Sequence, residues 1–249
     1  MVDFENAIDE FMNYVKAYDT NIDRFQVKIG HCLRVMGNCK MLAKSIGLSE
    51  EEIDVAMLVG LLHDIGKLRQ YSVIKQKRKD HGDFAVEILA QNNYIRHYIK
   101  EKEYDDVIFK AIKNHNKYKI EDGLSSKELL FSKIIRDSDE LDIFYEMAEV
   151  FKIDKENYKN LIVTEDVLEK FEYKQDYLIN KKETNNDLDQ MVWIMSFIYC
   201  MNFKESFKKL KEEDLINRII DKFEYNEETE IQMLKVKQIA NDFVNTKLK

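Results

Sequence analysis

His63 and Asp64 stand side by side at the end of an apolar run, Val59-Gly-Leu-Leu-His-Asp-Ile-Gly-Lys67. An imidazole and a carboxylate are costly to bury unless each finds a polar partner. Either the two groups are satisfied by each other and by solvent, or both bind a third group that supplies the missing partner. A metal ion is such a group, and this hypothesis requires further ligands elsewhere in the chain.

Four of the five histidines lie on or beside apolar stripes with helical spacing, namely His31, His63, His81 and His115. For any one of them alone, a satisfied core histidine is the simpler interpretation. Four in one chain, together with Asp64, favour a shared ligand. The fifth, His97, lies in a polar stretch and is expected on the surface.

Acidic candidates occur in the segment 133–143, where aspartates interrupt an apolar helical pattern. Periodicity does not choose between Asp137 and Asp139, because each shares its helix face with apolar residues. A solvated carboxylate face is the alternative to a cation site here.

The elements that must position these groups are predicted to be helices. The chain has 249 residues, no proline and seven glycines, with 45% apolar residues, so little interrupts helices and an ordinary core is expected. We predict an all-α fold in which residues 1–150 carry every candidate ligand. Residues 151–249 form a helical extension packed on the first part, giving one structural unit. The apolar run 191–203 is too short to cross a bilayer and is expected to be a buried helix.

Local signals predict where several helices begin and end. Gly47 should terminate the helix that carries the first histidine. Ser49 should cap the next helix in a capping box with Glu52, and Asp80 should cap the helix that follows. Gly66 is expected to let the chain turn away after the His-Asp pair.

The balance of charges limits the partners. The formal net charge of −8 argues against a nucleic acid polymer or an anionic membrane, but allows a small phosphorylated substrate held locally. Cys32, Cys39 and Cys200 form no Cys-x-x-Cys pair, and we interpret them as reduced thiols in the core. The acidic N-terminal segment lacks the pattern of a signal peptide. We therefore expect a cytoplasmic protein; a homo-oligomer is compatible with the sequence.

The order His31, His63-Asp64 and Asp139 resembles the H…HD…D signature of the HD-domain metal-dependent phosphohydrolases. The surrounding segments VKIGHCLRV, LLHDIGK, AIKNHNKY and IIRDSDELDIF are also similar to that family, over about residues 20–150. The resemblance implies an HD-domain helical bundle. It also implies that Asp139, which precedes a charged and then an apolar residue, is the final ligand. Asp137 would then lie behind the ligands or on the helix surface.

The resemblance further implies two metal ions, because His81 and His115 occupy the positions of the extra histidines in dinuclear members. One ion would bind His31, His63, Asp64 and Asp139, and the second would bind His81 and His115, with Asp64 bridging. Imidazole and carboxylate ligands favour a divalent transition metal such as Fe, Mn, Ni or Zn over Mg. The chain has Asn116 where the cyclic-di-nucleotide phosphodiesterases have a second consecutive histidine, and it lacks their Gly-Tyr-Pro. It is therefore closer to dinuclear members that act on nucleotides.

Metal-activated water would attack phosphorus in such a site, which makes Asp64 catalytic through the ions it holds. Lys67, one helical turn later, could stabilise charge on the phosphoryl oxygens, although a solvated lysine is the alternative. The resemblance favours contact between Lys67 and phosphate. Arg69 is expected to bind substrate with it, at the start of a basic rim that recruits phosphate, whose other members are Lys75, Lys77, Arg78 and Lys79. An ordinary solvated loop is the alternative for this rim.

Two functions of different class follow from these residues. The first is a phosphomonoesterase or phosphodiesterase that hydrolyses a nucleotide or related small phosphorylated substrate. The second is a catalytically silent helical module that binds metal and nucleotide as a sensor or regulator. Because every ligand position is intact, we favour the enzyme.

Overall fold

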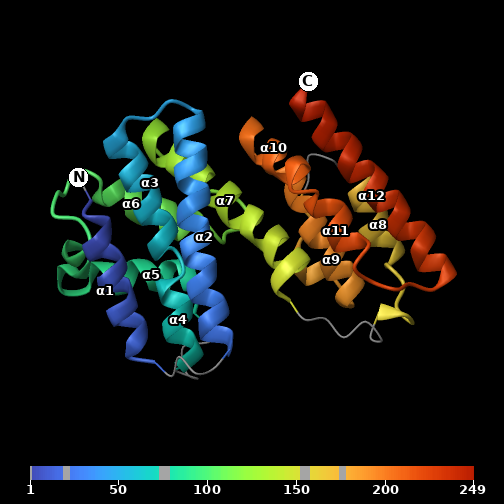
Figure 1. Ribbon diagram of the computed structural model, residues 1–249, viewed down its shortest axis with the longest axis horizontal. Coiled ribbons are helices and arrows are strands. Elements are labelled where there is room, and N and C mark those ends of the chain that lie inside the picture. Colours follow the sequence, from blue (N-terminus) through green and yellow to red (C-terminus); the bar gives the residue numbers. More distant parts are fainter. Residues whose placement is uncertain (1, 19–22, 73–78, 152–157, 174–177) are drawn as a thin grey trace. The chain divides into compact units, whose positions relative to one another are not determined.

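A computed structural model describes residues 2–18, 23–72, 79–151, 158–173 and 178–249. Every regular element in these ranges is helical, which confirms the predicted all-α class (Figure 1). In chain order the elements are α1 Phe4–Lys16, α2 Asp23–Ser45, α3 Glu50–Leu62, α4 Ile65–Ser72, α5 His81–Ala90, η2 Gln91–His97, α6 Asp105–Asn114, α7 Ser126–Tyr145, η3 Glu146–Val150, α8 Glu165–Tyr173, η5 Lys181–Glu183, α9 Asp187–Met195, η6 Ser196–Tyr199, α10 Lys204–Glu212, α11 Leu215–Ile220 and α12 Glu227–Leu248.

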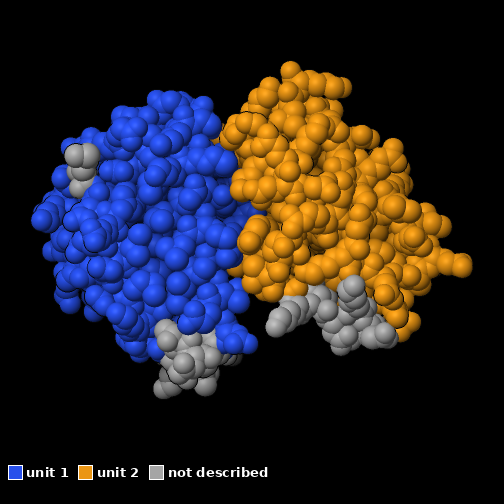
Figure 2. All heavy atoms as spheres, viewed as in Figure 1, with its two compact units in different colours: residues 1–142 blue, residues 143–249 orange. Residues whose placement is uncertain are grey.

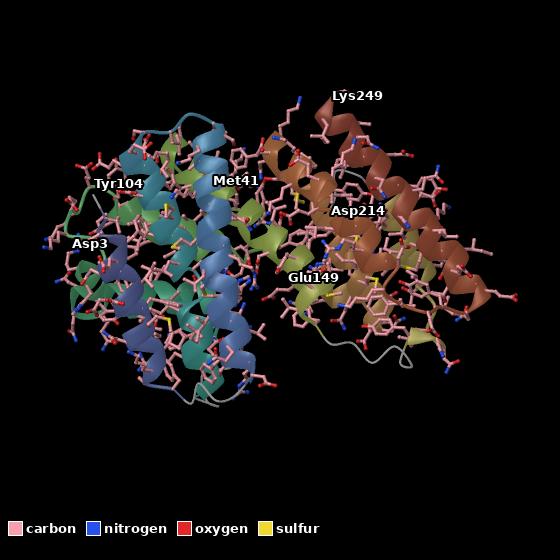
Figure 3. All side chains as sticks on the ribbon, in the orientation of Figure 1. Asp3, Met41, Tyr104, Glu149, Asp214 and Lys249 are labelled. Carbon is pink, nitrogen blue, oxygen red and sulfur yellow. The ribbon has the colours of Figure 1, made fainter. Side chains whose placement is uncertain are left out.

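The chain divides into two compact units, residues 1–142 and 143–249, which are coloured separately in Figure 2. The division falls inside α7, whereas the sequence suggested a division near residue 150. The packing of a C-terminal extension on the first part stays a prediction. Figure 3 shows how side chains fill the space between the helices of each unit.

The turn between α2 and α3 forms as the sequence predicts. Gly47 has a φ of 75°, in the left-handed region that favours glycine, and its N–H donates to the carbonyl of Lys44 at 3.1 Å. Ser49 caps α3, and its side chain and that of Glu52 form the predicted capping box. The two helices thus reverse direction over a few residues, so that His31 of α2 can face the end of α3.

Gly60 allows α2 and α3 to approach closely just before the His-Asp pair. A Cβ atom at this position would lie 2.8 Å from the Cα of Met36 and 2.9 Å from the Sγ of Cys39. Any larger residue would therefore push α3 away from α2. The close contact brings His63 next to His31.

Gly66 has a different role from the one predicted. The chain changes direction at His63 and Asp64, and Gly66 lies inside α4. A Cβ atom there would lie 2.4 Å from the carbonyl oxygen of His81 and 2.7 Å from the backbone nitrogen of Ala85. This glycine is needed because the first turn of α5 packs directly on α4, which places His81 beside Asp64. Asp80 caps α5 as predicted, accepting from the N–H groups of Gly82 and Asp83.

The second unit has its own apolar core and contains no candidate ligand of the predicted centre. The run 191–203 is buried over most of its length but is not the single helix predicted, because α9 ends at Met195, η6 ends at Tyr199 and residues 201–203 are not helical. Cys200, predicted to lie in the core, is only partly buried. The buried carboxylate of Asp189 accepts from the backbone N–H and the hydroxyl of Thr164, which ties the start of α8 to α9. Within the described ranges, none of the helices has the length and apolar character needed to cross a membrane.

Candidate metal centre

Helices α2 to α7 bring together all six predicted ligands, which belong to the first unit. His31 comes from the middle of α2, and His63 and Asp64 lie between α3 and α4. His81 begins α5, His115 follows the last residue of α6, and Asp139 lies in α7. The cluster contains three overlapping sets whose ligand atoms lie within 4.8 Å of one another: His31, His63 and Asp64; His63, His115 and Asp139; Asp64, His81 and His115.

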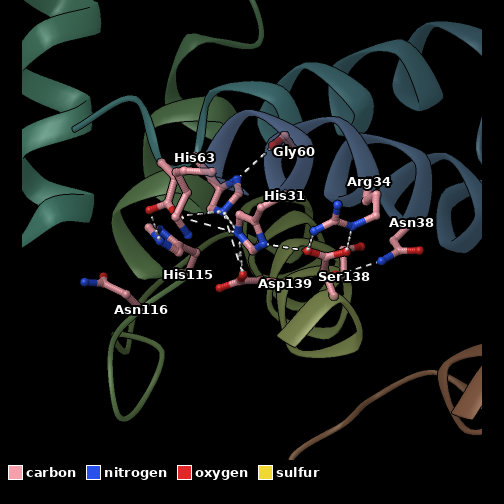
Figure 4. A network of polar contacts seen from close by, with 12 residues as sticks. His31, Arg34, Asn38, Gly60, His63, His115, Asn116, Ser138 and Asp139 are labelled. Atoms are coloured by element: carbon pink, nitrogen blue, oxygen red, sulfur yellow. Dashed lines mark hydrogen bonds and ion pairs between the residues drawn. The ribbon is translucent and has the colours of Figure 1, made fainter. Parts of the chain in front are cut away.

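The first part of the centre is built around the Nε2 atoms of His31 and His63, which lie 3.2 Å apart (Figure 4). Oδ1 of Asp139 lies 3.1 Å from Nε2 of His31 and 3.8 Å from Nε2 of His63. Oδ2 of Asp64 lies 3.6 and 3.5 Å from the same two nitrogens. Two imidazoles and two carboxylates therefore converge on one point, as the ligands of a single cation do.

The second part of the centre faces the other oxygen of Asp64. Oδ1 of this carboxylate lies 3.4 Å from Nε2 of His81 and 3.6 Å from Nε2 of His115. Each oxygen of Asp64 thus faces its own pair of imidazoles. A carboxylate in this position can join two cation sites.

Hydrogen bonds at Nδ1 orient three of the four imidazoles. His31 bonds Oδ2 of Asp142 at 2.7 Å, His63 bonds the carbonyl of Gly60 at 2.8 Å, and His115 bonds the carbonyl of Ile112 at 2.6 Å. An oxygen acceptor at Nδ1 fixes the ring and holds a proton there, so that the Nε2 lone pair is available to a metal when the ring is neutral. These rings are therefore oriented as metal ligands before any ion binds.

Two buried atoms at the centre have no hydrogen-bond partner among the described residues, and they test whether a metal fits. Oδ1 of Asp64 and Nε2 of His115 are both unpaired, although neither is exposed to solvent. Unpaired buried polar atoms are rare and call for a missing partner. Since one is an anionic oxygen and the other an imidazole nitrogen aimed at it, a divalent cation satisfies both. The donor set therefore fits a metal.

Lys28 is a member of the centre that the motif analysis missed. Its Nζ lies 2.6 Å from Oδ2 of Asp64, and its side chain is largely buried. Burial alone would lower the pKa of Lys28, but the carboxylates of Asp64 and Asp139 raise it above its ordinary value. The available signal was its position three residues before His31, on the same face of α2.

The electrostatics of the centre separate the imidazoles into two kinds. Burial and Lys28 act to lower the pKa of His31, but hydrogen bonds to Asp139 and Asp142 outweigh them and raise it to about 9. Burial lowers the pKa of His63 to about 3 and that of His81 to about 4. At neutral pH the ring of His31 is therefore protonated in the metal-free protein, whereas the rings of His63 and His81 are neutral.

The two carboxylates of the centre remain ionised. Burial would raise the pKa of Asp64, but Lys28 and His63 hold it well below its ordinary value. Burial also acts to raise the pKa of Asp139, and the hydrogen bond from His31 reverses the effect. Both groups therefore supply negative charge for a cation.

Arg34 and Asp142 form a support behind His31 that the sequence did not disclose. Nε and Nη2 of Arg34 donate to the two oxygens of Asp142 at 2.6 and 3.0 Å (Figure 4 labels the arginine). A forked pair of this kind holds a carboxylate in one orientation. Asp142 is thereby fixed against His31.

The structure separates the two aspartates that periodicity left open. Asp139 approaches both His31 and His63, as described above. Asp137 is fully buried and belongs to none of the potential ligand sets found in the described ranges. Asp137 therefore does not lie on the helix surface, which is one of the two positions predicted for it.

The predicted substrate-binding residues lie on α4. The backbone N–H of Lys67 donates to the carbonyl of Asp64 at 2.9 Å, whereas its ammonium group forms no hydrogen bond or ion pair with the residues that the structure describes. The charge of Lys67 contributes to lowering the pKa of His81. Arg69 instead lines a pocket of about 440 Å³ that also includes Tyr14, Tyr94 and His97. Its role in binding substrate stays a prediction.

Of the predicted basic rim, Lys75, Lys77 and Arg78 lie outside the described residues. Lys79 pairs with Glu87 on the surface. His97, expected on the surface, has a side chain that is 56% exposed and lies 3.6 Å from Glu10. It takes no part in the cluster.

Comparison with known proteins gives one family. A family described as "HD domain" matches residues 29–226, which include all six predicted ligands. No curated protein and no solved structure matches the chain.

Proposed function

Because the chain belongs to the HD-domain family, a superfamily of metal-dependent phosphohydrolases, we propose that it hydrolyses a nucleotide or a related small phosphorylated substrate. Phosphomonoester and phosphodiester substrates both fall within this proposal. The observation that carries it is the placement of Asp64, whose two oxygens face two pairs of imidazoles. One of those oxygens and the facing Nε2 of His115 are buried without a partner.

The proposed ligand sets follow from these contacts. His31, His63, Asp64 and Asp139 would hold one ion, and Asp64, His81 and His115 would hold the second. Neutral imidazoles favour Fe, Mn, Ni or Zn over Mg as the bound metal. When bound, such ions lower the pKa of water and polarise a phosphoryl oxygen, which is the chemistry that hydrolysis at phosphorus needs.

In this proposal, groups around the ligands orient the imidazole rings and contact the substrate. Asp142 holds the ring of His31, and Gly60 and Ile112 hold those of His63 and His115 through their carbonyls. Lys67 has an ammonium group without an ion pair among the described residues, so it can contact the anionic substrate without first breaking another bond. Negative charge that develops on the phosphoryl oxygens would be stabilised by this group.

Substrate reaches the centre from the side where ligands are partly exposed. The side chains of His81 and Asp139 keep 25% and 17% of their surface exposed, whereas those of His31 and His63 are buried. The buried ligands exclude water from the back of the site, which strengthens its electrostatic interactions. An anionic phosphate group would therefore bind at the open side, next to Lys67.

A panel of phosphorylated compounds, assayed with added Mn²⁺ or Fe²⁺, tests this function. We expect turnover of at least one nucleotide, its loss in Asp64→Ala, and retention of helix content in that variant by circular dichroism. Lys67→Ala should lower turnover about 100-fold while metal content stays unchanged. Binding of nucleotide without hydrolysis of any compound would instead support the sensor function. Full turnover in Asp64→Ala would exclude the proposed centre.

A further inference from the structure

His81 differs from the other imidazoles of the centre in what faces its Nδ1 atom. The Nδ1 atoms of His31, His63 and His115 each meet an oxygen. Nδ1 of His81 instead lies 3.2 Å from Nδ2 of Asn116, which is an N–H donor. A neutral imidazole carries one proton, so a donor at Nδ1 forces that proton onto Nε2. Nε2 of His81 is the atom that faces Asp64.

The orientation of the Asn116 amide is fixed by a neighbouring carboxylate. Nδ2 of Asn116 lies 2.9 Å from Oδ2 of Asp80. Asp80 is held in place because it caps α5 and because Nζ of Lys117 pairs with it at 3.0 Å. Reversing the amide would place its oxygen against a carboxylate oxygen at a cost in energy, so in the metal-free protein the NH₂ group faces Asp80. Its second hydrogen then points at His81.

The oxygen of the same amide lacks a partner in the part of the chain that the structure describes. Oδ1 of Asn116 is buried and accepts no hydrogen bond from these residues. Gly82 packs against it, since a Cβ there would lie 2.7 Å from Oδ1 and 3.0 Å from the carbonyl oxygens of Ile112 and Lys113. The present orientation is good for Asp80 but poor for the oxygen, so the two orientations are closer in energy than a fully paired amide would allow.

We propose that Asn116 is a positioning residue that selects the tautomer of His81 and so weakens and gates the second metal site. In the metal-free protein Asn116 holds the proton of His81 on Nε2, which blocks coordination. Binding of the second ion requires the amide to reverse, so that Oδ1 accepts a proton now carried on Nδ1. The proton on Nε2 leaves to solvent and one is taken up at Nδ1, so that the ring stays neutral. This inference rests on the proposed metal centre, and it predicts that the second ion binds more weakly than the first.

The tautomer can be read directly in the metal-free protein by ¹⁵N NMR of histidine-labelled chain, with His81→Gln used to assign the resonances. We expect His81 to carry its proton on Nε2, and His63 and His115 to carry theirs on Nδ1. Addition of Zn²⁺, which is diamagnetic, should move the His81 proton to Nδ1. A metal-free His81 that already carries its proton on Nδ1 would overturn the proposal.

A variant supplies the second measurement. In Asn116→Leu, which keeps the shape of the side chain and removes the donor, Zn²⁺ titration by calorimetry should show the second ion binding about tenfold tighter, the equivalent of one hydrogen bond. The first ion should bind within about twofold of its affinity for the unmodified protein. Asn114→Leu is the matched control, because the amide of Asn114 bonds Lys110 and Glu121 and no histidine. Unchanged or weaker binding of the second ion in Asn116→Leu would refute the proposal that Asn116 weakens the second metal site by selecting the tautomer of His81.

These measurements use no phosphorylated compound, so their failure is separable from failure of the proposed function. If the protein shows the expected histidine tautomers but hydrolyses no compound, the role of Asn116 is supported and the proposed hydrolase function is wrong. If the protein hydrolyses nucleotides but the metal-free His81 already carries its proton on Nδ1, the hydrolase function is supported and the role of Asn116 is wrong.

Discussion

Nζ of Lys28 lies 2.6 Å from Oδ2 of Asp64, on the carboxylate that both imidazole pairs face. The protein therefore supplies its own cation at the point where the proposed metal ions share a ligand. Any ion that binds Asp64 must compete with this ammonium group, or remain beside it at a cost in Coulomb repulsion. We therefore expect Lys28 to lower the affinity of the centre for metal.

Replacing Lys28 with methionine should tighten the binding of the first metal ion. Methionine keeps much of the length of the side chain and removes its charge, so that Asp64 is free to bind the ion. We expect the dissociation constant for Mn²⁺ to fall about tenfold, or about 1.4 kcal/mol, in calorimetric titrations at fixed pH.

Lys40→Met provides the control for this charge change, since Lys40 lies on the same helix but is exposed. Its affinity for Mn²⁺ should match that of the unmodified protein. Weaker binding in Lys28→Met would show that the lysine organises the site rather than competing with the ion.

The affinity for the first ion should rise with pH because of His31. Hydrogen bonds to Asp139 and Asp142 outweigh burial and hold the pKa of His31 at about 9 in the metal-free protein, and coordination requires the neutral ring. Below about pH 9 each bound ion must therefore release one proton, so affinity should increase about tenfold per pH unit and level off above that value. Calorimetry in buffers of different ionisation enthalpy measures the released proton.

Asp142→Asn should shift this pH dependence. Loss of the carboxylate removes one of the interactions that raise the pKa of His31, so the affinity should level off at a lower pH. Equal affinities at pH 7 and pH 8 in the unmodified protein would contradict the role given to His31.

Much of the site could be predicted because its ligands belong to local sequence patterns. His31, His63, His81 and His115 lie on apolar stripes near predicted helix ends, and the order of the ligands resembles a known signature. Capping residues such as Ser49 and Asp80 act within a few residues, so the sequence also predicts where those helices begin.

The remaining features depend on contacts between distant segments. Arg34 and Asp142 are separated by 108 positions, and no periodicity shows that they meet behind His31. Gly66 was interpreted as a turn because glycine favours turns, but its role is the approach of His81. Asp137 and Asp139 can be distinguished only by knowing which face of α7 is turned towards α2. The sequence pattern of one helix does not carry this information.

Asp139, and not Asp137, should be the ligand that α7 contributes. Asp139→Asn removes a carboxylate that lies 3.1 Å from Nε2 of His31, so the first ion should bind at least about 100-fold more weakly. Asp137→Asn should retain the metal, since Asp137 belongs to no potential ligand set in the described ranges, although its full burial makes a loss of thermal stability expected. Metal analysis of the two purified variants, with thermal melts recorded alongside, decides between them. If only the Asp137 variant loses metal, Asp137 is the ligand and the assignment of Asp139 is wrong.

The centre should hold two ions, which is the prediction that reaches furthest beyond the shared signature. His81 and His115 direct their Nε2 atoms at Oδ1 of Asp64, while His31 and His63 take Oδ2. Without an ion, the buried Nε2 of His115 has no hydrogen-bond partner within the described ranges. We therefore expect about two metals per chain when metal is supplied in excess, and about one in His115→Ala, because only the second set loses a ligand. His97→Ala is the matched control and should keep both ions, since His97 is exposed and lies outside the cluster. A chain that never binds more than one ion under saturating metal would leave the family assignment standing, and would require another partner for His115.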